Sequence, residues 1–445
     1  MVPPDNKTTR SATVGAAENV IPVPLFAELA GYGPFAGRRN LGVHDPLYCR
    51  VLTVNDGSRR NVVIVTDTIA SDEKSCRVLR MELATDFALY PESIMFVATH
   101  SHSSTAPGNS VGVGYQTPNE EFTANWRSAI RQTLTAAIAN EEPVRAFAGR
   151  ARLGQALGRR RTTAADAECD TDIRFVKLIR NDGSTKVLLH NHAMHGVAFG
   201  RTLQVSADWM GAANAEIKAR GLAEMPIFLY GTAGDVNPIR QTCDPEKRHL
   251  NLEWIAGHYA DDLEKAWGDA EEIPLAPVSA VLETVELPTE KVDPAECRGA
   301  VAKLRAMGSG ETKKLSDYIG DRLTEMAALA ECGHDFRVLR DLQAMKMGDL
   351  ALYSIPGEAF LNAGKMLMER SDAGFPVAIS VANGHAGYLP SREMFEQYPD
   401  MCSGEDFGRF GFYEVWFGPG SLRAKFKPDV EEFIVDKLLE LGSRI

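Results

Sequence analysis

The sequence predicts an α/β fold with mixed β-sheets flanked by helices, and three observations support this fold class. Short apolar runs typical of buried strands alternate with longer segments that have the spacing of amphipathic helices. Turns at residues 56–57, 182–183 and 348–349 each separate two strand-like segments, which predicts three β-hairpins. Polar side chains follow five strands, and ligands of α/β proteins collect at the carboxyl ends of strands. We therefore expect a single large catalytic domain with its active site at these ends.

The expected elements follow one another without an internal repeat or a low-complexity linker, so residues 21–445 are expected to form one domain. Residues 1–20 are expected to be a poorly ordered polar segment, and residues 25–45 a glycine-rich loop. Predicted strands cover residues 47–54, 61–66, 94–98, 144–151, 174–180, 186–190, 226–230, 278–287, 336–347, 350–355 and 376–382. Predicted helices cover residues 74–87, 119–140, 209–221, 250–266, 294–331 (with a break near Ser309), 358–369 and 428–441.

Composition narrows the classes of partner. The 445 residues carry a formal net charge of −12, which argues against nucleic acid or an anionic membrane surface, because both need a basic footprint. No run approaches the ~18 apolar residues of a membrane span, and no secretory signal is recognisable. The seven cysteines are scattered without a CxxC pair, which fits reduced thiols in the cytoplasm. We expect a cytoplasmic protein with a small-molecule partner, and homo-oligomer formation stays open.

The most informative stretch is residues 92–108, ESIMFVATHSHSSTAPG. Residues 94–98 form an unbroken apolar run typical of a strand buried on both faces, and the motif THSH follows directly. Because side chains alternate along a strand, His100 and His102 are expected on one side of its carboxyl end. An isolated His-x-His is equally compatible with two surface histidines in a loop.

Four further strands also end in side chains that can bind or transform a ligand, namely those before His195, Asp235, Glu358 and Tyr388. Zinc takes imidazole nitrogen and carboxylate oxygen readily, and a catalytic zinc keeps one position open for water. Two histidines and one glutamate from different strand ends would make such a site. No short zinc motif such as HExxH occurs, so a metal-free site is the alternative. Three other histidines are expected to pack or to support ligands rather than to bind metal: His190, His192 and His385.

Three further features could contact a ligand or support the site. The basic cluster Gly158 to Arg161 is typical of a solvated loop, and otherwise it would grip an anionic or carbonyl group. His44 and its neighbour Asp45 either form a hydrogen-bonded pair within the glycine-rich loop or line the site. Asp235 is expected to cap a turn or to orient a ligand histidine.

Six segments occur in a fixed order between residues 31 and 398: GYGPFAGRRNLGVHDPLYCR, FVATHSHSS, HAMHGVAFG with VSADWMG, FLYGTAGDVNP, SIPGE and NGHAGYLPSREMFE. In this order they resemble the catalytic domain of the neutral/alkaline, non-lysosomal ceramidase family. The resemblance implies a zinc-dependent hydrolase of a carbon–nitrogen amide bond. The residues that match the family's zinc ligands are His100, His195, Glu358 and Tyr388. It also implies that His102 lies beside the reacting bond, and that Arg159 is the arginine near the substrate.

Two departures from the family bear on the substrate. The serine of the family's GDVSP segment is replaced by Asn237, and the chain ends soon after its last helix instead of continuing into a β-sandwich domain. An asparagine amide can hydrogen-bond an oxyanion but cannot act as a nucleophile, so zinc-activated water would attack. We therefore predict a short relative that cleaves a linear N-acyl amide or a lactam.

The residues expected to act in that reaction are His102, Asp235 and Asn237 in catalysis, and Arg159 and His44 at the substrate. Two alternatives stay open from the sequence. A zinc-dependent esterase or lactonase could use the same site. A catalytically silent relative could keep the metal site without turnover.

Overall fold

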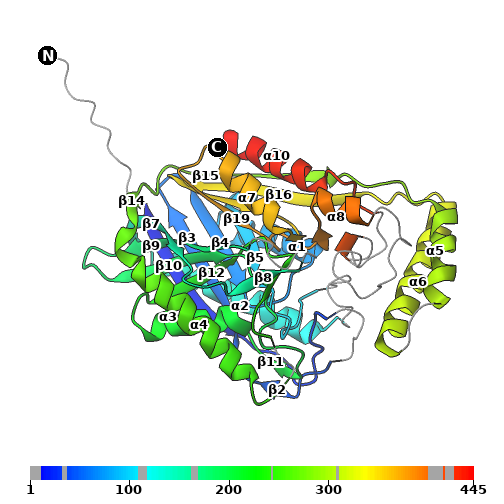
Figure 1. Cartoon of the computed structure of the whole chain (residues 1–445). Helices are drawn as coiled ribbons and strands as arrows, with labels where there is room; N and C mark the ends of the chain where they lie inside the picture. Colours follow the sequence, from blue (N-terminus) through cyan, green and yellow to red (C-terminus); the bar gives the residue numbers. More distant parts are fainter. Residues whose placement is uncertain are drawn as a thin grey trace.

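Three β-sheets with helices on their outer faces form the body of the molecule, which confirms the predicted α/β fold class (Figure 1). The computed structural model describes residues 12–32, 38–108, 118–161, 169–241, 244–306, 310–398, 414–415 and 425–445. Besides the N-terminal segment, two predictions fall on residues outside the described ranges. The glycine-rich loop includes residues 33–37, and the expected helix break near Ser309 lies within residues 307–309.

Each sheet combines antiparallel and parallel strand pairs. The first has the order β5-β4-β3-β1-β6, with β1 Thr13–Ile21, β3 Leu47–Asn55, β4 Arg60–Thr66, β5 Ile94–Ala98 and β6 Glu142–Pro143. The second has the order β12-β10-β9-β7-β14, with β7 Arg145–Arg152, β9 Asp172–Ile179, β10 Thr185–His192, β12 Met225–Tyr230 and β14 Glu271–Ile273. The third has the order β15-β16-β17-β19, with β15 Val278–Leu287, β16 Val338–Met347, β17 Leu350–Ser354 and β19 Phe375–Ile379.

Three short two-stranded ladders join loops at the ends of these sheets. They are β2 Gly42–Val43 with β11 Gln204–Val205, β8 Gly158–Arg160 with β13 Val236–Pro238, and β18 Glu358–Ala359 with β20 Tyr388–Leu389. The last two ladders contain four of the residues that the sequence singled out for chemistry: Arg159, Asn237, Glu358 and Tyr388.

Helices cover the outer face of each sheet. Helices α1 Glu73–Asp86 and α2 Glu120–Ala139 pack on the first sheet, α3 Asp208–Ala219 and α4 Arg248–Lys265 on the second, and α7 Leu361–Arg370 and α10 Val430–Ser443 on the third. A hairpin of α5 Pro294–Ala306 and α6 Gly310–Glu331 projects from the body (Figure 1). The short helices are η1 Pro91–Ser93, η2 Trp267–Asp269 and α8 Arg392–Gln397.

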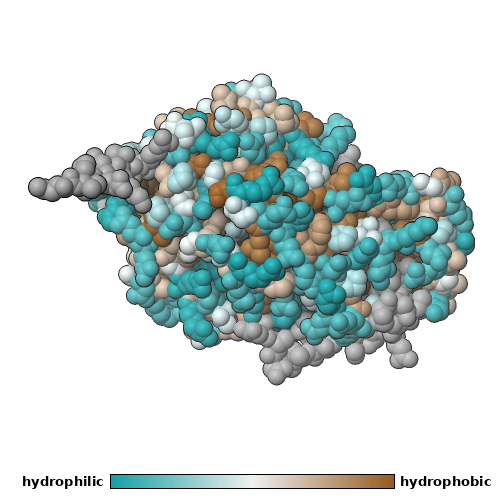
Figure 2. Space-filling view, turned by 90° about the horizontal axis from the view of Figure 1, so that it is seen from above, coloured by the Kyte–Doolittle hydropathy of each residue, from teal (hydrophilic) through white to brown (hydrophobic). Residues whose placement is uncertain are grey.

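The surface near α10 is a mosaic of hydrophilic and hydrophobic residues, with the helical hairpin extending to one side (Figure 2). Among the described helices, none combines the length and the apolar character that crossing a bilayer requires.

The same supersecondary unit occurs once in each sheet. A hairpin is followed by a helix and then by a strand that pairs in parallel with the second hairpin strand. The three units are β3-β4-α1-β5, β9-β10-α3-β12 and β16-β17-α7-β19. Each unit therefore supplies one parallel strand pair, whose two carboxyl ends lie side by side. The loops that leave these ends carry the candidate site.

One hydrophobic cluster fills the space between the three sheets. It receives side chains from the parallel strands of every unit: Val65 and Val97, Leu189 and Leu229, and Leu352 and Ile379, all at most 3% exposed. Because burial of each such side chain contributes roughly 1.5–3 kcal/mol, this shared core holds the three sheets against one another.

The expectation of poor order across residues 1–20 is wrong for Thr13–Ile21, which forms β1 inside the first sheet, paired with both β3 and β6. Small and polar residues in this stretch hide its strand character. A Cβ atom at Gly15 would lie 1.9 Å from the carbonyl oxygen of Ala137, so only glycine lets α2 approach the strand this closely. Residues 1–11 lie outside the described part of the chain.

Helix α10 buries a carboxyl group in its first turn, which makes stability depend on pH. Glu431 is 4% exposed, and burial, with added repulsion from Asp235 and Glu432, raises its pKa to about 8. Because the folded pKa lies above the unfolded one, this contribution is complete below about pH 4.5 and is lost as pH rises through 8.

Glu431→Gln should therefore gain stability relative to the parent as pH rises from 5 to 9. The gain is expected to reach at most a few kcal/mol, since each pKa unit corresponds to about 1.4 kcal/mol. Thermal unfolding at several pH values measures it, and stability curves that stay parallel would contradict the expectation.

Candidate metal centre

His100 follows β5 in a left-handed backbone conformation, with φ of 67°. A non-glycine residue keeps this conformation only where its surroundings hold it. The backbone N–H of His100 donates to the carbonyl oxygen of Thr68, and Nδ1 lies 2.7 Å from the carbonyl oxygen of Ile69. Nδ1 therefore donates its proton to Ile69, and Nε2 is the ring nitrogen that faces Glu358.

His102 lies beside His100, with 3.4 Å between their Nε2 atoms. The route differs from the expected strand alternation, because the strand ends at Ala98 and a turn brings the two rings together. Burial, with repulsion from His100 and His195, lowers the pKa of His102 well below its ordinary value. Its Nδ1 atom is buried without a hydrogen-bond partner, and the ring packs edge-on against Tyr32.

His195 lies three residues beyond the end of β10. Its backbone N–H donates to the carbonyl oxygen of Val236, and Nδ1 lies 2.9 Å from the carbonyl oxygen of Ala233. Burial lowers the pKa of His195 to about 4, so the ring is neutral at pH 7. As in His100, a backbone carbonyl fixes the proton on Nδ1 and leaves Nε2 available as a ligand.

Glu358 lies in β18, four residues after the end of β17, and is 5% exposed. Its Oε2 atom is 3.2 Å from Nε2 of His100 and 3.3 Å from Nε2 of His195. Burial alone would raise the pKa of Glu358, but the contacts from His100, His195 and His385 hold it well below its ordinary value. The carboxylate is therefore ionised where the two imidazoles converge.

The residues of this cluster fit a divalent transition metal. Donor atoms of a tetrahedral zinc site, each about 2.0–2.1 Å from the ion, lie roughly 3.3 Å from one another. The two distances from Glu358 Oε2 match this value. Both Glu358 Oε2 and His195 Nε2 are buried yet have no hydrogen-bond partner, as expected of atoms whose lone pairs serve a metal.

Tyr388 lies next to Glu358, as its register partner in the parallel β18–β20 ladder. Its hydroxyl is 3.4 Å from Nη2 of Arg161. Burial and the charge of Glu358 raise the pKa of Tyr388 well above its ordinary value, although Arg161 opposes this shift. The phenol is therefore neutral, and the ladder places Tyr388 beside Glu358.

The basic cluster forms strand β8, paired with β13, rather than a solvated loop. Arg160 forms an ion pair with Asp235 at 2.6 Å, and Arg161 contacts Tyr388. The side chain of Arg159 is exposed. The geometry thus favours Arg161 over Arg159 as the arginine at the centre, because only Arg161 is in contact with a proposed ligand.

Asp235 lies directly before β13, and Asn237 lies within this strand. Asp235 is fully buried, and its carboxylate accepts hydrogen bonds from Arg160 and from the backbone N–H of Leu361 at the start of α7. It therefore joins a helix start to β8 and has no hydrogen bond to a ligand histidine. Asn237 pairs with Arg159 in the ladder, and its Oδ1 atom is buried without a hydrogen-bond partner.

The structure does not bring His44 to this cluster. Its Nδ1 atom lies 2.8 Å from Asp45 Oδ2, and its ring contacts Phe199. His44 lines a separate pocket of about 530 Å³, and none of the four proposed metal ligands is among the described lining residues of that pocket. A role for His44 in substrate binding therefore has no support from this geometry.

His190 and His192 pack behind the site. His190 hydrogen-bonds Asn214 at 2.7 Å and Tyr259 at 3.0 Å, while Nδ1 of His192 lies 3.1 Å from the carbonyl oxygen of Asp172. Neither ring contacts Glu358 among the described interactions.

His385 supports the cluster by holding Glu358. Its Nδ1 atom accepts the backbone N–H of Gly387 at 3.2 Å, so the proton sits on Nε2, which donates to Glu358 Oε1 at 3.0 Å. This bond leaves Oε2 facing His100 and His195. The sequence analysis expects His385 to pack or to support a ligand, and only its partner, Glu358, could not be inferred from the spacing of the NGHAGY segment.

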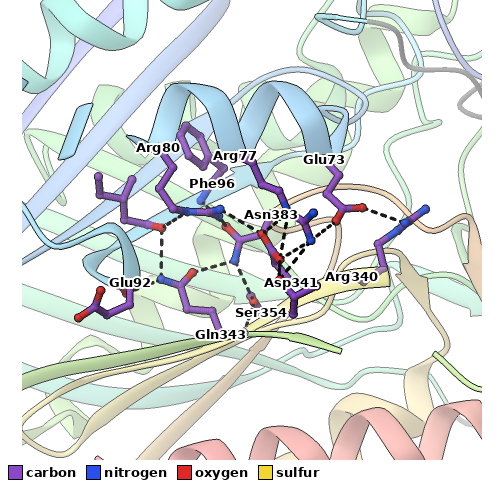
Figure 3. Close-up of polar contacts among 12 residues, drawn as sticks. Glu73, Arg77, Arg80, Glu92, Phe96, Arg340, Asp341, Gln343, Ser354 and Asn383 are labelled. Atoms are coloured by element: carbon purple, nitrogen blue, oxygen red, sulfur yellow. Dashed lines mark hydrogen bonds and ion pairs between the residues drawn. The ribbon is translucent and has the colours of Figure 1, made fainter. Parts of the chain in front are cut away.

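A polar network locks the loop that carries His385 (Figure 3). Asn383 has a φ of 59°, and its Oδ1 atom accepts from Arg80 of α1 and from the backbone N–H of Phe96 in β5. Its Nδ2 atom donates to Gln343 and Ser354, in β16 and β17. The network therefore joins the first and third sheets two residues before His385.

His385→Phe should weaken metal binding by ~10- to 100-fold, the usual cost of losing a partner that orients a ligand. His385→Gln is the matched control, because its amide can still donate to Glu358 and should recover part of the affinity. Competition with a chelator of known affinity measures both variants. Equal metal affinity in the parent and His385→Phe would show that His385 does not orient Glu358.

No protein-family model matches this chain, and no curated protein matches it either. Solved structures do share its fold. One is a neutral ceramidase from Pseudomonas aeruginosa, with a TM-score of 0.72 and 16% identity, covering 98% of this chain and 75% of that one. Another, a ceramidase complexed with C2, has the same TM-score and identity, and covers 97% of this chain and 75% of that one. This chain therefore has a ceramidase-like fold.

Proposed function

We propose that this chain is a metal-dependent hydrolase that cleaves a carbon–nitrogen amide bond. The observation that carries the proposal is the meeting of two imidazoles, each held at Nδ1 by a backbone carbonyl, with one carboxylate oxygen at 3.2 and 3.3 Å in a buried site. The ceramidase-like fold supports an amide as the bond cleaved, since the similar structures are named as ceramidases.

Zinc is the metal we assign to this site. We assign His100, His195, Glu358 and Tyr388 as its protein ligands, with a further position left for water. When bound, zinc polarises a carbonyl and lowers the pKa of a water ligand towards ~7. The fixed Nδ1 protons of both histidines and the ionised Glu358 suit a divalent cation.

His102 is the residue we assign to proton transfer. Its lowered pKa keeps the ring neutral at pH 7, so the ring can accept a proton and pass it to the leaving amine. Asn237 of β13 is the residue we assign to hydrogen-bonding the oxyanion through its amide. Arg161, which contacts Tyr388, is the residue we assign to orienting the carbonyl group of the substrate.

The substrate class we propose is a linear N-acyl amide or a lactam. An asparagine at position 237 has no hydroxyl to form an acyl-enzyme, so one attack by water must complete the reaction. Small amides need only the polar groups already present, whereas ceramide also needs an apolar groove for its chains.

The test combines metal analysis with a substrate panel. About one zinc per chain is expected, together with chelator-sensitive hydrolysis of N-acyl amides or lactams and slower hydrolysis of matched esters and lactones. Absence of a stoichiometric transition metal would refute the metal site. Turnover of esters or lactones alone would refute the amide assignment while leaving the metal site in place.

Asn237→Ala should lower turnover by ~10- to 1000-fold, the range for losing one oxyanion donor, and should leave the metal content unchanged. Asn237→Ser is the comparison variant, because a hydroxyl can still donate a hydrogen bond and should retain part of the activity. Steady-state kinetics with metal analysis measures both. Unchanged turnover in Asn237→Ala would remove this residue from the reaction.

A further inference from the structure

Two arginines face each other on the second sheet. Arg150 of β7 and Arg174 of β9 are direct register partners in an antiparallel pair, so their side chains leave the same face. Cβ atoms of such partners lie about 4.5–5.5 Å apart, and like charges at this distance destabilise the pair. An arrangement of this kind is stable when a negative group sits between the two guanidinium groups.

The protein's own carboxylates compensate this pair only in part. Arg174 has a side chain that is 11% exposed, a buried Nε atom without a hydrogen-bond partner, and one described ion pair, to Asp170 at 3.7 Å. Asp170 is already engaged by the backbone N–H of Ala193 at 2.9 Å and by His192 at 3.4 Å. The guanidinium of Arg150 has no described hydrogen bond or ion pair among the residues of the structure. The described residues therefore satisfy the guanidinium groups of these two neighbouring arginines only in part.

Both arginines line a pocket of about 430 Å³, which is within the size range of small-molecule sites. Its wall includes Ala193 and Thr232, just past the carboxyl ends of the parallel strands β10 and β12, where α/β proteins place ligands. Lys365 of α7 adds a third cation to the lining. None of the proposed metal ligands is among the described lining residues, so this pocket is distinct from the metal centre.

We propose that this pocket binds a small organic anion through a phosphate or carboxylate group held between Arg150 and Arg174. Planar guanidinium forks bind such groups with two parallel hydrogen bonds, and the buried Nε of Arg174 would gain its missing partner. The carboxylates of Asp170, Asp172 and Glu369 also line the pocket and favour a ligand whose remaining part carries hydrogen-bond donors. The proposal does not depend on the reaction at the metal centre.

Calorimetric titration of the full chain with inorganic phosphate, and separately with acetate, tests the site at constant ionic strength. At least one anion is expected to bind saturably to the parent, and comparison of the two assigns the preferred group. Arg174→Gln and Arg150→Gln should each weaken that binding by about tenfold or more, the usual value of a charge-assisted hydrogen bond. Arg150 is exposed, so Arg150→Gln stays informative even if Arg174→Gln fails to fold.

Arg152→Gln is the matched control, because it removes the same charge two residues along β7 from a side chain outside the described lining. It should bind the anion as the parent does. Metal content is measured in every variant, so that phosphate held at the metal centre is recognised by its survival in Arg150→Gln and Arg174→Gln. Failure of both anions to bind, or equal affinity in the parent and both pocket variants, would overturn the proposal.

Discussion

His195→Ala is expected to release the metal and to reduce hydrolysis to the background rate. The substitution removes one of the two imidazole ligands whose Nε2 atoms converge on Glu358. The loss should exceed the ~10- to 100-fold that follows loss of an outer partner such as His385. His100→Ala should behave in the same way, since its ring is held by the same kind of carbonyl contact. Metal analysis after dialysis, with turnover assays, measures both effects.

A fold-matched control separates metal loss from unfolding. His334→Ala changes an exposed histidine outside the cluster and should keep both metal and activity. Circular dichroism should show that His195→Ala remains folded, because its ring serves the site and not the shared core between the sheets. Full metal occupancy in folded His195→Ala would exclude it as a ligand.

His102→Ala is expected to keep the metal and to slow turnover by ~100- to 10,000-fold, the range for losing a general acid–base group. The roles of His100 and His102 are distinguishable because only His100 has Nδ1 fixed by a backbone carbonyl and Nε2 within 3.2 Å of Glu358. Nδ1 of His102 has no partner, which leaves its tautomer free to change during proton transfer.

The pH profile gives a second readout for His102. The limb of kcat assigned to this histidine should disappear in His102→Ala, whereas a variant that is merely destabilised keeps the shape of the profile. Loss of metal from His102→Ala to the same extent as from His195→Ala would show that His102 is a ligand instead.

Much of the fold could be predicted because local sequence patterns indicate many of its strands and helices. The buried strand 94–98 is continuous in apolar residues and is observed with those bounds, and α2 starts after Asn119, whose side chain accepts the N–H of Phe122. Strand β1 could not be predicted in this way. Its residues Gly15 to Ala17 are small, which lets α2 lie close, and they give no run of large apolar side chains.

In the candidate site, too, residues in local motifs could be predicted, whereas roles that depend on distant contacts could not. Motifs at strand ends predicted the positions of His100, His195 and Glu358, and the structure brings these side chains together. The role of Arg161 and the partner of His385 depend on hydrogen bonds between residues far apart in the sequence, and no local pattern encodes such contacts. Arg159 was chosen within a run of three arginines, and the resemblance does not fix the register within that run, so the sequence could not separate Arg159 from Arg161.

The origin of the three proposed donors has a consequence for how the protein resists unfolding. His100 follows a strand of the first sheet, His195 one of the second and Glu358 one of the third, so the site exists only while all three sheets are docked. A bound ion would then connect the three sheets, and its binding free energy would stabilise only the state in which they are docked. Chelation would loosen this junction without breaking any strand pairing, so resistance to proteases should follow metal occupancy as closely as activity does.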